Sequence, residues 1–243
     1  SLPVAVAIAH AVLHKFSEGH VYEDLPFPKG ALLVRGWDFG TTQAVVWSAY
    51  FEEDGDEYWW DLLEYFAEQS DADRQCQRVI ELTGKAFPFW NDRAMVSGVL
   101  DYCDPAGNAQ RDTGRSVSVL NSYDIYPGFC RAPLQESIAA YNRLLAHRDK
   151  KGKLVYRIDK KGCPMLYEAS AGGLRYPGEG EPGYGSDGPG KGPQFGNYDH
   201  LGDASRYAKI NLLKLLREPI ERTNPAVGPF GKPVKINRKR RWF

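Results

Sequence analysis

Three short segments each place an aspartate where a buried element meets the surface. They are residues 35–40 (RGWDFG), 101–107 (DYCDPAG) and 200–204 (HLGDA). The first two follow aliphatic runs that are typical of strands, and the third opens an amphipathic helix. Carboxylates from separate elements can converge on one place, where cations must neutralise them. This pattern predicts a divalent-metal phosphodiesterase, in which two ions about 3.5–4 Å apart bind the attacking and leaving oxygens.

Asp38 lies where the first of these strands is expected to emerge, between Gly36 and Gly40. Glycines at such a position allow the backbone of a ligand to approach closely. An aspartate at the end of a strand also commonly caps a turn. From this segment alone, a catalytic and a structural role for Asp38 both stay open.

The second segment contains two acids, Asp101 and Asp104. They are three positions apart, so on a strand they point to opposite faces and cannot line one site. Pro105 ends the strand, because proline has no amide hydrogen for the ladder. We favour Asp104 as the metal ligand at this exit, and we expect Asp101 to be a structural or supporting acid.

Asp203 follows His200 by three positions and Asp199 by four. Residues at these spacings share one face of a helix. His200 can therefore bind the same metal as Asp203, or it can position a water or a phosphate. The alternative is a structural histidine.

Composition sets broader limits. The 243 residues are 42% hydrophobic, enough for one substantial core in an α/β domain with appendages. The 31 basic and 31 acidic residues cancel, which argues against a purely electrostatic DNA coat but leaves a local basic face possible. The four cysteines form no C-x-x-C pair and indicate neither a zinc site nor a disulfide framework. The apolar start at 2–13 is too short to span a bilayer, so we expect a soluble protein with no membrane partner.

Hydrophobic patterns predict a mixed sheet flanked by helices. The expected strands are 31–38, 43–51, 57–66, 95–103, 125–130 and 154–158, and the expected helices are 3–16, 70–83, 116–122, 133–147, 163–172 and 198–216. Short turns join the first three strands into an antiparallel meander, although 58–63 also fits a helix. Ser70 is expected to cap its helix, with Asp71 and Asp73 near the positive end.

We expect three regions along the chain. Residues 1–30 form an N-terminal helix and linker, 31–217 the main domain, and 218–243 a Pro-rich basic tail. Between 178 and 196, eight of nineteen residues are glycine, which predicts a mobile loop or hairpin. No phosphate-binding G-x-x-x-x-G-K-[ST] loop occurs, so we do not expect ATP hydrolysis by this chain.

Taken together, these segments resemble the nuclease domain of the large terminase subunit of tailed bacteriophages. The matching pieces are 36–42 (GWDFGTT), 103–107 (CDPAG), 163–166 (CPML) and 200–208 (HLGDASRYA), of which the last is the most specific. Their order and element types match over about 31–216, which is most of the chain.

The resemblance implies an RNase H-like (RuvC-type) fold and an endonuclease that cuts concatemeric double-stranded viral DNA during packaging. Asp38, Asp104 and Asp203 would bind two Mg²⁺ or Mn²⁺ ions, with His200 as an accessory ligand. Asp38 would bridge both ions. The implied partners are double-stranded DNA, an upstream ATPase domain, the portal and the small terminase subunit, in the cytoplasm of an infected bacterium.

Basic side chains outside these motifs are candidates for sequence-independent phosphate contacts. They are Arg111, Arg115, Lys160, Lys161, Arg175 and Lys191. Each taken alone is equally well explained as a solvated surface charge. Two other functions compete with the packaging nuclease: a RuvC-like junction resolvase that uses the same acids, and a non-catalytic docking module of a packaging motor.

Overall fold

The computed structural model describes residues 11–39, 42–104, 116–128, 133–179 and 197–217. The chain divides into two compact units, Ser1–Asn211 and Leu212–Phe243. The first unit contains the whole sheet and every site residue discussed below. Of the second unit, only the end of the last helix is described.

A mixed six-stranded sheet forms the centre of the first unit. Its strands are β1 (Val21–Tyr22), β2 (Ala31–Asp38), β3 (Thr42–Glu53), β4 (Asp56–Glu68), β5 (Val96–Cys103) and β6 (Tyr156–Asp159), in the spatial order β1-β6-β4-β3-β2-β5. β3 is antiparallel to both of its neighbours, while all other pairs are parallel. The expected mixed α/β sheet and its meander are confirmed.

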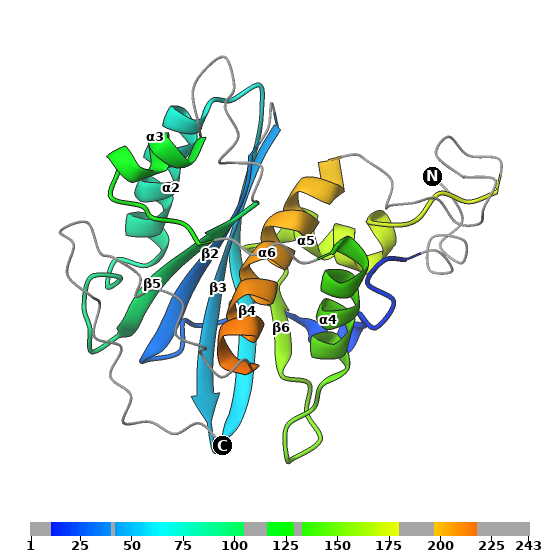
Figure 1. Ribbon diagram of the computed structural model, residues 1–243. Coiled ribbons are helices and arrows are strands. Elements are labelled where there is room, and N and C mark those ends of the chain that lie inside the picture. The colour runs from blue at the N-terminus through cyan, green and yellow to red at the C-terminus, as the bar shows by residue number, and fades with distance from the viewer. Residues whose placement is uncertain (1–10, 40–41, 105–115, 129–132, 180–196, 218–243) are drawn as a thin grey trace. The chain divides into compact units, whose positions relative to one another are not determined.

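Helices cover both faces of this sheet. They are α2 (Ala72–Ala86), α3 (Ser116–Ser122), α4 (Leu134–Ala146), α5 (Pro164–Glu168) and α6 (Asn197–Arg217), with short η1 (Glu18–His20) and the π-helical η3 (Ala169–Gly173). α2 and α3 lie on one face, and α4, α5 and α6 lie on the other (Figure 1). The core under α2 and α3 includes Trp37, Trp47, Val79 and Leu120, all without exposed surface.

The ambiguous segment 58–63 is a strand, because it belongs to a long hairpin. β3 and β4 pair from Thr42↔Glu68 to Glu53↔Asp56. Asp54 and Gly55 form the tip with φ of 56° and 80°. Two successive positive φ values are what the tight turn of a two-residue hairpin needs, and Asp-Gly adopts them readily. The turn chemistry therefore outweighs the helix-like spacing.

Several expected local features are wrong. The cap of α2 is Asp71, whose side chain accepts a hydrogen bond from the Arg74 amide, and not Ser70. The described end of the expected helix 3–16 forms turns, and 125–128 forms no strand beyond one bridge from Gly128 to Tyr102. The expected helix 163–172 is present, as α5 followed without a gap by the π-helical η3. Cys76, Cys103 and Cys163 are free and buried, while Cys130 lies outside the described residues.

Most of the Gly/Pro-rich stretch 178–196 and the tail 218–243 lie outside the described residues. The expected domain limits stay a prediction. One strand, β1, comes from within the expected linker 1–30 and pairs with β6.

Close contact between β2 and α6 depends on a glycine. A Cβ atom added to Gly36 would lie 1.9 Å from the backbone oxygen of Ala204 and 3.0 Å from the Ala208 side chain. Side chains alternate along a strand, so Gly36 and Asp38 face α6 while Arg35 and Trp37 face α2. Gly36 therefore lets α6 lie against β2 beside Asp38.

We expect Gly36→Ala to destabilise the protein, because the added methyl group meets backbone that cannot rotate away. Overpacking of this kind costs about 1–3 kcal/mol or more. Urea unfolding measures the loss. The matched control is Gly84→Ala in α2, where a Cβ meets nothing within 4 Å and helix propensity predicts a gain of about 0.5–1 kcal/mol. Equal effects of the two substitutions would contradict the close packing.

Candidate active site

The parallel register of β2 and β5 places Asp38 and Asp104 at one edge of the sheet. Trp37 pairs with Cys103 in this ladder, so the next residues along each strand are these two acids. Asp38 is the last residue of β2 and is 8% exposed, and Asp104 directly follows β5 and is half-buried. The two acids predicted at the ends of these strands, Asp38 and Asp104, therefore lie at the same edge of the sheet.

The first turns of α6 add a histidine to this edge. Nδ1 of His200 lies 2.7 Å from Oδ2 of Asp38, and its Nε2 lies 3.8 Å from Oδ1 of Asp199. The hydrogen bond with Asp38 raises the pKa of the His200 ring above 6.5, although partial burial opposes the rise. His200 therefore directly contacts the first predicted acid.

Asp203 lies on the same helix and is held by its own neighbours. Nε and Nη2 of Arg206 both donate to Oδ1 of Asp203, at 3.1 and 2.8 Å. The hydroxyl of Tyr207 lies 3.5 Å from Oδ2. Arg206 therefore pairs with a carboxylate on its own helix. The contribution of Tyr207 was not expected.

The three predicted acids interact electrostatically. The pKa of the Asp38 carboxyl is raised from 3.8 to about 6. Burial raises it most and the charges of Asp203 and Asp104 add to the rise, while the hydrogen bond and charge of His200 oppose it. Carboxylates so placed disfavour each other's ionisation unless a cation lies near. The edge therefore concentrates negative charge that the protein only partly compensates.

Asp101 points to the opposite face, as its spacing from Asp104 predicts. Its carboxylate accepts from Nε and Nη2 of Arg35 at 2.7 and 2.9 Å, and from the Trp37 indole at 2.7 Å. This two-point pairing uses both carboxylate oxygens and lies under α2. The expected structural role of Asp101 fits these contacts.

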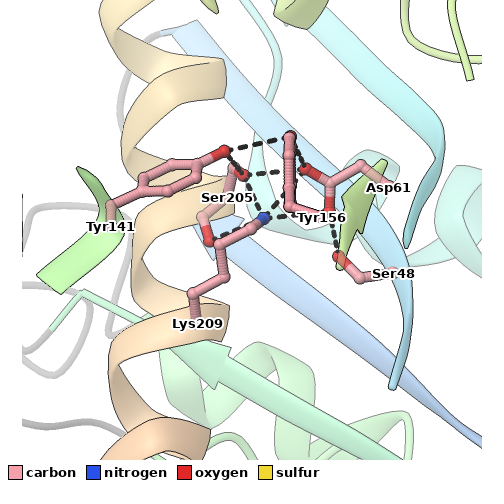
Figure 2. Close-up of polar contacts among 6 residues, drawn as sticks. All are labelled: Ser48, Asp61, Tyr141, Tyr156, Ser205 and Lys209. Carbon is pink, nitrogen blue, oxygen red and sulfur yellow. Dashed lines mark hydrogen bonds and ion pairs between the residues drawn. The ribbon is translucent and has the colours of Figure 1, made fainter. Parts of the chain in front are cut away.

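Sequence reasoning missed a buried ion pair between α6 and the sheet. Nζ of Lys209 lies 2.9 and 2.8 Å from the two carboxylate oxygens of Asp61 on β4, and neither side chain is exposed. Four hydroxyl groups, from Ser48, Tyr141, Tyr156 and Ser205, complete the network (Figure 2). Burial lowers the pKa of Lys209 more than any other single cause, but the charges and hydrogen bonds of Asp61 and Tyr141 together outweigh it, so the pKa is raised. The signal available in the sequence was a lysine on the apolar face of α6.

Three of the candidate DNA contacts lie in the described residues. Lys161 pairs with Asp24 at 2.7 Å with both side chains largely exposed, and the Lys160 ammonium lies 4.6 Å from the centre of the Tyr167 ring. Arg175 forms a backbone bridge with Ala11. Arg111, Arg115 and Lys191 lie outside the described residues. Lys160 and Lys161 follow β6, which runs parallel to β4 and therefore in the same direction as β2.

The donor types at the edge suit a hard divalent cation. Carboxylate oxygens are the ligands that Mg²⁺ and Mn²⁺ prefer. Burial, and after it the charges of Asp203 and Asp104, disfavour the ionised form of Asp38, which a bound cation would favour. Within the described residues, no group of three or more His, Cys, Asp or Glu side chains is arranged to hold an ion by itself. In this structure His200 contacts Asp38 and Arg206 contacts Asp203, so a basic side chain lies beside each of these acids.

Comparison with solved structures identifies the fold. The large terminase of a thermophilic bacteriophage superposes with a TM-score of 0.60 and 16% identity, over 84% of this chain and 45% of that one. The P22 large terminase nuclease domain gives 0.54 and 12%, over 83% and 92%, and the SPP1 domain, solved with bound Mn, gives 0.50 and 15%, over 79% and 94%. The chain has the RNase H-like fold of large terminase nuclease domains.

Of the comparisons with known proteins, the structural one alone finds similar proteins. Neither family models nor curated proteins match the sequence. The chain spans a little under half the length of the thermophilic phage's large terminase, whereas it matches nearly the whole of the P22 and SPP1 nuclease domains. No helix in the described part is both long and apolar enough to cross a membrane. The resemblance read from the sequence motifs is therefore confirmed at the level of fold.

We expect Lys209→Met to destabilise the protein by about 3–5 kcal/mol, because it leaves the Asp61 charge buried without its partner. Urea unfolding measures this loss. Adding Asp61→Asn should recover part of it, since the amide removes the charge but keeps an acceptor for the hydroxyl groups. Lys85→Met on exposed α2 surface is the control and should change stability by less than about 0.5 kcal/mol. A double variant less stable than Lys209→Met alone would contradict this account.

The Asp38 pKa predicts a pH dependence of stability without divalent metal. The pKa of the folded state, about 6, lies above the ordinary 3.8, so the folded state binds more protons between these values and stability falls as pH rises through them. Asp38→Asn should remove this fall. Its unfolding free energy relative to wild type should increase by about 2–3 kcal/mol between pH 4 and pH 7.

Urea unfolding in EDTA at several pH values measures the difference. Asp92→Asn changes an exposed carboxylate and is the control, which should run parallel to wild type. A constant difference between Asp38→Asn and wild type across this pH range would refute the assigned pKa.

Proposed function

We propose that this chain is the metal-dependent endonuclease of a viral DNA-packaging terminase. One observation supports this best: Asp38, Asp104 and Asp203 interact electrostatically at one edge of a sheet whose fold is that of terminase nuclease domains. Phosphodiester hydrolysis needs both a nucleophile and neutralisation of the charge that develops on phosphate. A concentration of carboxylates at an accessible edge suits both needs when divalent cations bind there.

Each residue has a distinct role in this proposal. Asp38, Asp104 and Asp203 would hold two Mg²⁺ or Mn²⁺ ions, which supply an activated water and neutralise charge on the leaving 3′ oxygen. Asp38 is central, because it interacts with both other acids. His200 fixes the Asp38 carboxylate through its hydrogen bond of 2.7 Å, or joins the ligand set. Bound Mn in the SPP1 nuclease domain supports divalent-metal use here.

The same comparison supports a proposed substrate and proposed partners. We propose double-stranded concatemeric DNA as the substrate, gripped through its phosphates by basic side chains such as Lys160 and Lys161. Because the thermophilic phage's large terminase is about twice as long as the matched region, the chain is proposed to work beside an ATPase motor, with the portal and the small terminase subunit. Its proposed place of action is the cytoplasm of the infected bacterium.

The first test is plasmid cleavage with Mn²⁺, Mg²⁺ or EDTA. We expect nicking and linearisation by wild type with metal and none in EDTA. Asp38→Asn, Asp104→Asn and Asp203→Asn should each reduce the rate by at least about 100-fold, because each removes an anionic metal ligand. Asp92→Asn should cut like wild type.

The other outcomes separate the competing functions. Cleavage that survives Asp38→Asn would show that the acids are wrongly assigned. A strong preference for four-way junctions over plain duplex would favour the resolvase. A folded protein that neither binds Mn²⁺ nor cuts DNA would leave the docking module as the better description.

A further inference from the structure

Asp203 differs from Asp38 in how its carboxylate is held. Both donors from Arg206 go to one oxygen, Oδ1. Within the described residues, the other oxygen has a single long contact, 3.5 Å from the Tyr207 hydroxyl. The Arg206 side chain is 10% exposed and that of Asp203 is 36% exposed. A buried guanidinium thus holds the inner oxygen of an acid that remains accessible.

Arg206 is itself anchored to a second helix. Its Nη1 donates to Oγ of Ser137 on α4 at 2.8 Å, and that hydroxyl donates to the Leu134 carbonyl at 2.7 Å. Ser137 has no exposed surface. An ordinary i,i+3 ion pair on a helix surface contributes only a few tenths of a kcal/mol and leaves both side chains free to move. Here the chain of contacts Ser137–Arg206–Asp203 ties the carboxylate to the body of the domain.

We propose that Arg206 is a positioning residue that fixes the Asp203 carboxylate, so that Oδ2 is presented as a metal-binding oxygen. This inference rests on the proposed metal-dependent nuclease. The planar guanidinium donates from two nitrogens to Asp203 and from a third to Ser137, which a lysine ammonium cannot reproduce. The orientation of Asp203 is therefore set before a cation arrives.

The two possible roles of Arg206, as a positive charge or as a positioning residue, predict opposite changes in metal affinity when it is removed. A nearby positive charge repels a divalent cation, so an electrostatic role alone would make Arg206→Met bind metal more tightly. If Arg206 positions Asp203, the freed carboxylate must be ordered again on binding, and affinity falls. Groups that orient metal ligands typically contribute 10–100-fold to metal affinity.

The experiment titrates the whole chain with Mn²⁺ by isothermal titration calorimetry. We expect Arg206→Met to weaken Mn²⁺ binding about 10-fold or more, and Arg206→Lys to weaken it as well, although it keeps the charge. Ser137→Ala leaves the Arg206–Asp203 pair but removes its anchor, and it should weaken binding by a smaller factor. Arg143→Met, an exposed arginine on α4, should bind like wild type.

Cleavage kinetics supply a second readout. The half-saturating Mn²⁺ concentration should rise in Arg206→Met, with the rate at saturating Mn²⁺ largely restored. Thermal unfolding in EDTA identifies variants that fail to fold. If Arg206→Met does not fold, Arg206→Lys and Ser137→Ala decide the question.

Failure of the positioning role can be distinguished from failure of the proposed function. Wild type that binds Mn²⁺ and cuts DNA, beside an Arg206→Met variant that binds Mn²⁺ equally or more tightly, would overturn the positioning role alone. Wild type that binds no Mn²⁺ would overturn the proposed function itself.

Discussion

The position of α6 on the sheet is the constraint on which the candidate site depends, and a buried ion pair helps to set it. Lys209 reaches both oxygens of Asp61 with no exposure to water. A buried pair adds little net stability compared with apolar side chains, but an unpaired buried charge is strongly unfavourable. Sliding α6 along β4 would separate the charges, so this pair favours one register. About two and a half turns earlier on α6, the same register brings His200 to Asp38.

On the two faces of β2, neighbouring acids have different partners and therefore suit different roles. Under α2, Asp101 has both oxygens occupied by Arg35 and an indole hydrogen bond besides. Under α6, Asp38 has one histidine contact and two nearby acids that oppose its ionisation. In the first arrangement the charge of Asp101 is paired with that of Arg35, which is typical of an acid with a structural role. In the second, burial and two nearby charges disfavour the ionised form of Asp38, and the hydrogen bond with His200 offsets this only in part.

Much of this arrangement could be predicted from sequence. The strand exits at Asp38 and Asp104 follow from aliphatic runs that end in glycine or proline, and the spacing of His200 and Asp203 follows from the helix period. Lys209 could not be assigned, because local sequence does not reveal that Asp61 lies opposite it. The cap of α2 was missed because Ser70 and Asp71 are both residue types that cap helices well, and the sequence does not decide which side chain reaches the Arg74 amide. Contacts between residues far apart in the sequence, such as Lys209 and Asp61, determine features that local sequence patterns cannot predict.

The chain order of the site has a consequence for protein synthesis. Asp38 and His200 are 162 positions apart, and α6 follows every other described element of the sheet domain. Ribosomes deliver the sheet long before this helix, and domains tend to fold as units once complete. A nascent or prematurely terminated chain therefore holds Asp38 and Asp104 without the third acid. On the proposed function, only a finished domain is able to cut DNA, which spares the template from incomplete copies of the enzyme.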